Sequence, residues 1–454
     1  MKIIIAGAGK IGSAMAEVLS SEGHDVTVID NSSEIISHVS DMMDVICLEG
    51  SAANSDVLIA AGAEDADLLI AATEKDEINM ICGVSARKLG TRHVISRIRD
   101  TEYLSKREFL REAFGLDMIV NPEYECAKEI SRILRFPGSS RVDAFSKGSV
   151  EIAEVNVIPG DKLEGIQLKD MAGKFGAKVL VSVVERGSEA IIPNGLFELR
   201  KGDILSVTGT ANELRKFFVS TGKYKKPVKS VVIMGGGRIS VYLCRILLES
   251  GISVCVIERD RERCELLSSL LPGASIIYGD ATRSEVLYEE GINSADAFVA
   301  LSGDDANNII TSMFVSHCPV DKIITKVSHS QYPEVIAASG LETVVTPQKI
   351  VAQQLARYVR AMSNSEGSSM ETLYSLAGGK AEALEFIVGE SALCINKPLK
   401  ELKIRPNTII AALIRDGKSI IPDGETSIRP GDHAIITAPA GVYHNIDEII
   451  EGIR

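Results

Sequence analysis

The 454-residue sequence is a tandem duplication, and this repeat limits the possible folds more than any other feature. The stretch IIIAGAGKIGSAMAEVLSSEGHDVTVID, at residues 3–30, returns as VVIMGGGRISVYLCRILLESGISVCVIE at residues 231–258. Later segments also recur, with IIPNG matched by IIPDG and RKGD matched by RPGD. Self-similarity at a fixed period indicates repeated structural units. We therefore expect two copies of one two-part unit.

Each copy begins with strand-length apolar runs that alternate with helical patterns, such as KIIIAG, DVTVID, DVICLEG, ADLLIAAT and HVISRIR in the first copy. Strands that alternate with helices predict a parallel sheet with helices on both faces. The second part of each copy has short strands, polar turns and, in the first copy, a single helical piece near residues 163–172. The predicted fold class is α/β, with tandem Rossmann-like parallel-sheet domains, each followed by a small α+β domain.

The same patterns predict the domain boundaries. Pro122 and Pro347 each open a helical pattern, and proline suits the first turn of a helix. The stretch SNSEGSS, at residues 363–369, has the composition of a flexible linker. The expected segments are a first Rossmann-like domain at 1–120, crossover helices at 121–140, a first small domain at 141–222, a second Rossmann-like domain at 228–346, a crossover helix and linker at 347–369, and a second small domain at 370–454.

Bulk properties exclude several classes of protein. The formal net charge of −13 argues against a nucleic-acid binder, which needs a basic face. No run approaches the roughly 18 consecutive apolar residues of a spanning helix, and the amino terminus lacks the pattern of a signal peptide. The eight cysteines are scattered without metal-ligand spacing, so we expect reduced, packed thiols in a cytosolic protein and no metal site.

The first copy carries a glycine turn typical of dinucleotide-binding proteins. Gly7, Gly9 and Gly12 form G-x-G-x-x-G between an apolar strand and a helix, whose amide groups and dipole favour phosphate. Asp30 ends the next strand, where an acid accepts hydrogen bonds from ribose hydroxyls. An acid there favours NAD or an adenine nucleotide over NADP. The alternative is a structural turn that has lost its ligand. The predicted residues are Gly7, Ala8, Gly9, Lys10, Ile11, Gly12, Asp30 and Asn31.

The second copy departs from this pattern. Ser240 takes the third glycine position, where we expect it to crowd the helix against the strand only slightly. Glu258 replaces the aspartate, and Arg238 stands where the first copy has Lys10. Nucleotide binding and a vestigial structural role both remain open for this copy. The predicted turn residues are Gly235, Gly236, Gly237, Arg238, Ile239 and Ser240.

Further polar residues follow the strands, and sites of this fold lie outside the carboxyl ends of the strands. Ser51 follows one strand, and Thr73 and Glu74 follow the next. Arg97 ends a further strand and matches Lys326 in the second copy; a surface ion pair is the alternative for Arg97.

The order of these motifs resembles a known family. G-A-G-K-I-G, Asp30, AATEKDEINM and ISRIRD, followed by a small strand-rich module and all repeated, resemble the regulator-of-potassium-conductance (RCK, or KTN) family. The double form resembles the peripheral subunits of Trk potassium-uptake systems, and the match covers essentially the whole chain. By this resemblance the nucleotide-binding residues also include Ser51, Thr73, Glu74 and Arg97 in the first copy and Glu258, Asp280, Ser302 and Lys326 in the second.

The resemblance also implies a function. It implies a cytosolic regulator, peripheral at the inner face of the cell membrane, that assembles as a tetrameric homo-oligomeric ring beneath a transmembrane Trk-type potassium transporter subunit. NAD(H) or ATP/ADP would gate the ion path, and the chain would not be an enzyme.

Two alternatives remain. An NAD-dependent dehydrogenase would need an acid–base residue beside the nicotinamide, yet none of the seven histidines lies in a recognisable catalytic motif. A nucleotide-binding scaffold could instead serve another protein partner, through apolar residues such as Ile130, Ile133 and Leu134 that we expect to be exposed.

Overall fold

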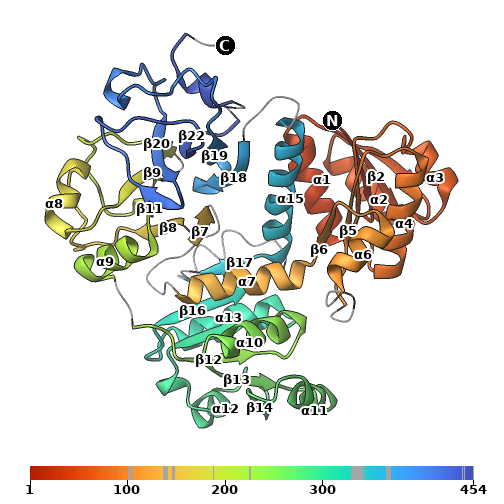
Figure 1. Cartoon of the computed structure of the whole chain (residues 1–454). Helices are drawn as coiled ribbons and strands as arrows, with labels where there is room; N and C mark the ends of the chain where they lie inside the picture. Colours follow the sequence, from red (N-terminus) through yellow and green to blue (C-terminus); the bar gives the residue numbers. More distant parts are fainter. Residues whose placement is uncertain are drawn as a thin grey trace. The chain divides into compact units, whose positions relative to one another are not determined.

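The computed structural model describes residues 1–100, 103, 106–135, 142–145, 149–187, 189–223, 226–328, 341, 343–364, 370–441, 443 and 445–452. The chain divides into two compact units (Figure 1). The parallel-sheet unit comprises Met1–Ile130, Val231–Cys318 and Ile323–Ala356. The antiparallel-sheet unit comprises Ser131–Ser230, Pro319–Lys322 and Arg357–Arg454. Each unit therefore collects the corresponding parts of both sequence copies.

The first parallel sheet has six strands in the order β3-β2-β1-β4-β5-β6. Its strands are β1 (Lys2–Ala6), β2 (Asp25–Asp30), β3 (Ile46–Glu49), β4 (Leu68–Ala71), β5 (His93–Arg97) and β6 (Met118–Val120). The order reverses direction between β1 and β4, which is the point where ligands bind in open parallel sheets. All four residues of β4 are buried, as expected of a central strand covered on both faces.

Helices connect these strands (Figure 1). They are α1 (Lys10–Ser21), α2 (Ser33–Met42), α3 (Ser55–Ala60), α4 (Asp76–Leu89), α6 (Arg107–Phe114) and α7 (Pro122–Arg135). Polar side chains cap several of their first turns: the Ser32 hydroxyl accepts from the Ile35 amide, and the Asn54 side chain accepts from the Asp56 amide. These caps satisfy amides that have no partner within the helix.

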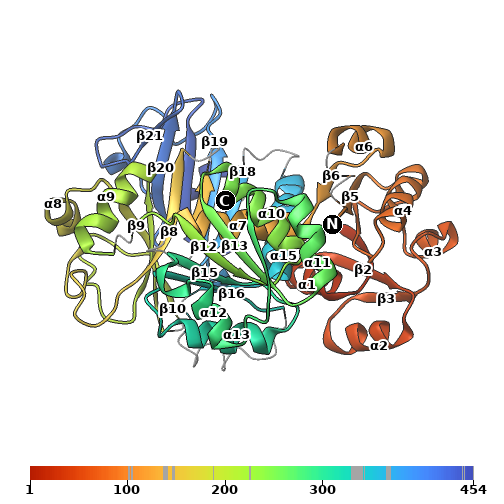
Figure 2. The same cartoon turned by 90° about the horizontal axis from the view of Figure 1, so that it is seen from below.

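The second parallel sheet repeats the arrangement, in the order β14-β13-β12-β15-β16-β17. Its elements are β12 (Ser230–Met234), α10 (Arg238–Glu249), β13 (Ser253–Glu258), α11 (Arg261–Leu270), β14 (Ser275–Tyr278), α12 (Ser284–Glu289), β15 (Ala297–Ala300), α13 (Asp305–Val315), β16 (Lys322–Lys326), β17 (Val344–Val345) and α15 (Pro347–Asn364). Figure 2 shows α10 and α11 on one face of this sheet and α12 and α13 on the other.

The antiparallel-sheet unit contains two five-stranded sheets, in the orders β10-β9-β11-β8-β7 and β18-β19-β22-β20-β21. The first contains β7 (Val142–Phe145), β8 (Val150–Asn156), β9 (Leu180–Arg186), β10 (Glu189–Ile191) and β11 (Ile204–Gly209). The second contains β18 (Met370–Leu376), β19 (Ala381–Ile387), β20 (Ile409–Arg415), β21 (Lys418–Ile420) and β22 (His433–Pro439). One buried cluster includes Phe145 and Val183 from the first sheet and Ala411 and Ile435 from the second, so the two sheets share a core.

These observations confirm the predicted fold class of two Rossmann-like domains, each followed by a small domain with an antiparallel sheet. The helical content of the first small domain differs from the expectation. The predicted piece near residues 163–172 starts later, as a 3-10 turn at Leu168–Asp170 followed by α8 (Met171–Phe175). Gly165, with a φ of +76°, interrupts the earlier stretch. A second helix, α9 (Ala211–Thr221), was not predicted.

The expectation that Ile130, Ile133 and Leu134 are exposed was wrong. Their relative exposures are 0%, 2% and 1%. The spacing of three and four residues places them on one stripe of α7, and such a stripe normally faces the interior. These residues therefore offer no surface to a partner. Residues 136–140 and 365–369, which we assigned to crossover and linker segments, lie outside the described residues.

All eight cysteines are free thiols, and five of them are buried. Burial raises the pKa of the Cys126 thiol, to about 12. Within the described residues, no helix has both the length and the apolar character needed to cross a membrane. The described part of the chain also holds no group of three or more histidine, cysteine or acidic residues arranged for a metal ion.

Candidate nucleotide-binding cavities

The first glycine turn links β1 to α1 and contains two backbone positions that only glycine fits, Gly7 and Gly12. Gly7 has a φ of +102°, and a Cβ there would lie 2.7 Å from the Thr73 amide nitrogen. A Cβ on Gly12 would lie 1.8 Å from the Gly7 carbonyl oxygen. By contrast, a Cβ on Gly9 would meet nothing within 4 Å, so this side of the turn faces open space. The turn is therefore tight on the protein side and open on the side where a ligand would approach.

Asp30 closes the turn from the neighbouring strand. Its Oδ2 accepts a hydrogen bond from the Ala8 amide at 2.7 Å, and its Oδ1 accepts one from the Ser32 amide at 3.0 Å. These bonds fix the carboxylate at the carboxyl end of β2, beside the glycine turn. Each oxygen has further acceptor capacity, so the carboxylate can still accept hydrogen bonds from ribose hydroxyls.

A cavity of about 730 Å³ opens at this edge of the first sheet. Its volume lies within the usual range for small-molecule sites, about 300–1,000 Å³. Ten of the predicted first-copy residues line it: Gly7, Gly9, Lys10, Ile11, Asp30, Asn31, Ser51, Thr73, Glu74 and Arg97. The two remaining predicted residues, Ala8 and Gly12, belong to the turn and are buried.

The cavity also has lining residues that the sequence did not assign to it. Lys75 and Arg99 come from the same copy, and Pro122 and Glu123 come from the start of α7. Five more lining residues belong to the second copy: Ile239, Lys326, Ser328, Pro347 and Gln348. The sequence predicts Pro122 and Pro347 only as the first residues of helices. It gives no indication that residues of the second copy line the first cavity.

A buried asparagine holds together the strand ends that form the cavity floor. The Asn79 Oδ1 accepts from the Thr73 amide at 2.8 Å and from the Thr73 hydroxyl at 2.7 Å. Its Nδ2 donates to the Arg97 carbonyl at 2.9 Å. Asn308 makes the matching bonds in the second copy, accepting from the Ser302 amide and donating to the Lys326 carbonyl, both at 3.0 Å. The repeat therefore preserves a clamp between β4 and β5, and between β15 and β16.

The first cavity carries an excess of basic side chains. Among the residues that the structure describes, five basic ones line it against three acidic ones. Arg97 donates from Nη1 to the Thr73 carbonyl at 3.2 Å, and its Nε has no hydrogen-bond partner among the described residues. Burial lowers the pKa of Arg97, and the nearby Arg99 charge lowers it further. A bound anion would relieve this crowding of like charges.

The second cavity, of about 490 Å³, lies at the equivalent edge of the second sheet. Of the predicted second-copy residues, its lining includes Gly235, Gly236, Gly237, Glu258, Asp280 and Ser302. Ile239 and Lys326 line the first cavity instead, Arg238 is exposed, and Ser240 is buried in α10. In the described part of the chain, three acidic residues and one basic residue line this second cavity, so its charge balance is opposite to that of the first.

The second glycine turn accommodates its sequence changes through side-chain contacts. The Ser240 hydroxyl donates to the Gly235 carbonyl at 2.5 Å, at the position where the first copy has no room for a Cβ. The Glu258 Oε2 accepts from the Gly236 amide at 2.7 Å, as Asp30 does from Ala8. A Cβ on Gly236 would lie 2.3 Å from Leu267 Cδ1.

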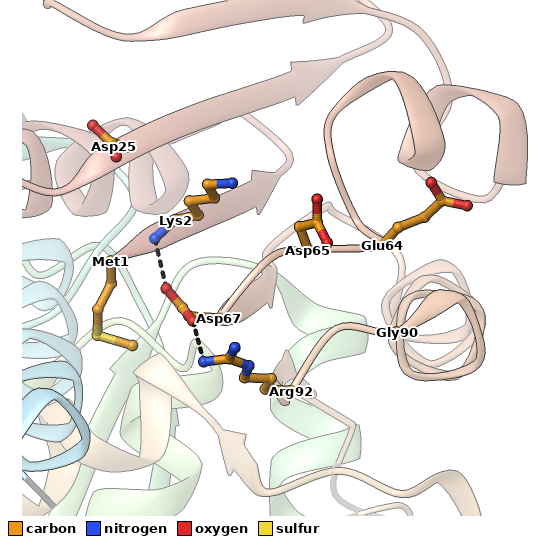
Figure 3. A pocket seen from close by; sticks show the side chains of 8 residues that line it. All are labelled: Met1, Lys2, Asp25, Glu64, Asp65, Asp67, Gly90 and Arg92. Atoms are coloured by element: carbon orange, nitrogen blue, oxygen red, sulfur yellow. Dashed lines mark hydrogen bonds and ion pairs between the residues drawn. The ribbon is translucent and has the colours of Figure 1, made fainter. Parts of the chain in front are cut away.

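A third cavity, of about 480 Å³, lies at the opposite edge of the first sheet (Figure 3). Its Asp67 carboxylate accepts hydrogen bonds from the Lys2 amide at 2.9 Å and from Arg92 Nη1 at 3.0 Å. Asp25, Glu64 and Asp65 also line it. This is the amino end of the strands, whereas ligands of open parallel sheets bind at the carboxyl end. The two glycine-turn cavities are therefore the better candidates.

Comparison with known proteins agrees with this organisation. Residues 3–122 and 231–347 match the TrkA-N domain model, and residues 152–220 and 383–450 match the TrkA-C domain model. The chain is 32% identical, over 450 residues, to the Trk system potassium uptake protein TrkA homolog of Archaeoglobus fulgidus. That alignment covers 99% of this chain and 100% of the archaeal protein.

Solved structures show the same fold. A crystal structure of the GsuK RCK domain superposes with a TM-score of 0.63 at 19% identity, covering 98% of this chain and 92% of that chain. A structure described as the GsuK channel bound to NAD also gives a TM-score of 0.63 at 19% identity, covering 98% of this chain and 77% of that chain. The family resemblance noted in the sequence is thereby confirmed. This chain belongs to the TrkA family, with two TrkA-N and two TrkA-C domains in tandem.

Proposed function

We propose that this chain is a cytosolic regulatory subunit that senses a nucleotide and gates a transmembrane Trk-type potassium-uptake transporter. The family assignment supports the potassium-transport role, because the archaeal relative is named as a Trk system potassium uptake protein. The observation that most supports nucleotide sensing is the first cavity, where the glycine turn, Asp30 and a set of cations converge.

The ligand in this proposal is NAD(H) or, alternatively, ATP or ADP. Its diphosphate lies over the amides at the start of α1, where the helix dipole and unpaired N–H groups favour an anion. Lys10 and Arg97 supply positive charge beside it, and Asp30 accepts hydrogen bonds from the ribose. A GsuK channel structure is described as bound to NAD, which supports a dinucleotide as one ligand of this fold.

The proposed mechanism is a shift between conformations. A ligand shifts an equilibrium only by its different affinity for the two states. The first cavity contains residues from both copies, including the start of α10 and the start of α15. A nucleotide in this cavity therefore contacts elements of both Rossmann-like domains and can favour one arrangement of them. We propose that a homo-oligomer, a tetrameric ring at the inner face of the membrane, transmits this change to the transporter.

Titration of the full chain with NAD, NADH, ATP and ADP tests the site. We expect Asp30→Ala to weaken binding by about tenfold or more, because a charge-assisted hydrogen bond contributes roughly 1.5–3 kcal/mol. Asp25→Ala is the matched control. It removes an exposed carboxylate from the other end of the same strand, and it should leave the affinity unchanged. Full affinity in Asp30→Ala would contradict the proposed pocket.

A dehydrogenase is the alternative function, and it predicts a different result. Incubation with NAD and candidate alcohols or hydroxy acids should then produce NADH absorbance. The sensor proposal expects nucleotide binding without turnover, together with co-purification of a Trk-type membrane subunit. Light scattering should report a tetramer.

A further inference from the structure

We propose that Lys326, a residue of the second copy, binds phosphate in the first cavity. This inference rests on the proposed nucleotide site and names a residue that selects for phosphate within it. From the sequence alone, Lys326 is the counterpart of Arg97 and is assigned to the cavity of its own copy. The structure instead places it in the lining of the first cavity, together with Arg97.

The position of Lys326 is fixed by the second sheet. It is the last residue of β16, and its backbone carbonyl accepts a hydrogen bond from the buried Asn308 side chain at 3.0 Å. Its Nζ donates to the Ser302 carbonyl at 2.6 Å. An ammonium group has three donors, and among the residues that the structure describes only this acceptor lies within hydrogen-bond distance. Two donors are therefore available to a ligand in the cavity.

The charge of Lys326 is poorly compensated. No carboxylate among the described residues lies within ion-pair distance of its Nζ, and Asp305 acts only as a more distant favourable charge. Burial lowers the pKa of Lys326, and the charge of Lys10, from the first copy, lowers it further. A partly buried cation without a paired anion is unfavourable. A phosphate in the cavity would supply that anion.

The surrounding cations explain why the ligand group should be a phosphate. Lys10 lies at the start of α1, and the Arg97 Nε has no partner within the residues that the structure describes. Both side chains line the same cavity as Lys326. These groups can only donate hydrogen bonds and attract negative charge. An uncharged nucleoside gains nothing from them. Lys326 should therefore favour a diphosphate over a nucleoside that has the same base and ribose.

Calorimetric titration of the full chain with ADP and with adenosine tests this inference. We expect Lys326→Gln to weaken ADP binding by about tenfold or more, the effect of losing one charge-assisted contact, and to leave adenosine binding unchanged. Lys326→Arg should retain ADP affinity, because the first copy has arginine at this position. Lys349→Gln is the matched control, because it removes an exposed lysine of α15 beside the cavity residue Gln348.

The binding event that Asp30→Ala weakens identifies the first cavity in these titrations. ADP affinity that is equal in Lys326→Gln and the unsubstituted chain would overturn the inference. An equal loss of ADP and adenosine affinity would also overturn it, since that result indicates a structural role. If the unsubstituted chain binds no nucleotide, the proposed function itself fails, and the two failures are thus distinguishable.

Discussion

At the scale of single residues, one buried aspartate in each small domain accepts hydrogen bonds that join a strand to a turn. Asp203 is fully buried and accepts hydrogen bonds from Arg186 Nε and Nη2, both at 2.8 Å, and from the Arg200 amide at 2.8 Å. Asp432 repeats the arrangement with Arg415. Each aspartate follows a turn glycine, Gly202 or Gly431, so its carboxylate holds a strand to that turn. Nothing in a single Gly-Asp pair reveals the arginine partner 17 residues earlier.

Removing this carboxylate should destabilise the first small domain. We expect Asp203→Ala to lower the free energy of unfolding by about 3 kcal/mol, because it breaks a buried ion pair and leaves a turn amide without its acceptor. Urea denaturation measures the change. Lys201→Ala, an exposed substitution in the same turn, is the control and should have little effect.

The Asp203 carboxylate should also make the stability of the chain depend on pH in the acidic range. Burial alone raises the pKa of Asp203, but the hydrogen bonds and charges of Arg186 and Arg200 outweigh it, so the pKa lies below the usual range. The stabilisation is therefore present above the unfolded pKa of about 3.9 and is lost as pH falls through the folded value. Stability of Asp203→Ala should depend less on pH in that acidic range than stability of the unsubstituted chain.

A further prediction at the residue scale concerns the packing of Leu267 against Gly236. Gly236 leaves space for the buried Leu267, whereas the first copy has Ala8 and Val39 at the matching positions, both also buried. We expect Gly236→Ala to cost about 1–3 kcal/mol through overpacking. Adding Leu267→Val should recover part of this loss, since the pair then matches the first copy. Additive effects in the double-mutant cycle would show that the two positions are independent.

At the scale of elements, the parallel sheets could be predicted because their strands are continuous apolar runs bounded by glycine turns. DVTVID became β2 and ADLLIAAT contains β4, with Asp30 and Thr73 at the predicted edge. The helix α9 was missed, although Thr210 caps it and Phe217 packs in the core. Its amphipathic pattern is short and lies among strands, so local sequence gives a weak signal.

The candidate site was predictable only within one copy. Glycine spacing and strand ends locate Gly7, Asp30 and Arg97, because these features are local in sequence. The contribution of Lys326 to the first cavity depends on packing between domains more than 200 residues apart in sequence, which no periodicity reports. The correspondence between the two sequence copies even assigns Lys326 to the second cavity. The opposite charge balance of the two cavities likewise emerges only when their linings are known.

At the scale of the whole molecule, the two small domains, one from each sequence copy, pack against each other. The two small sheets share one buried cluster, in which the rings of Phe145 and Tyr374 meet edge to face with centroids 4.4 Å apart. A different cluster, which includes Phe217, consists of residues from the first small domain only, within the described part of the chain. The sequence repeat suggests four separate modules, whereas the shared core makes the two small domains one unit. We therefore expect them to unfold together.

Alanine substitution of each phenylalanine should distinguish the core that the two small domains share from the core of the first small domain. Phe145→Ala should destabilise both small domains by about 3–5 kcal/mol, the usual cost of removing a buried phenylalanine ring. Hydrogen exchange should then increase in β8 and β9 and also in β20 and β22. Phe217→Ala, the matched control, should increase exchange mainly in the first small domain. Faster exchange confined to the first domain in both variants would contradict a shared core.

We propose that the first glycine turn holds the phosphates of a nucleotide. Hydrogen exchange of the full chain, with and without saturating NAD or ADP, measures this directly at the amides of the turn. We predict slower exchange at residues 8–13 and in the segment after Asp30, and no such slowing in Asp30→Ala. Unchanged exchange at the turn while the nucleotide is bound would show that it binds elsewhere and would contradict the account.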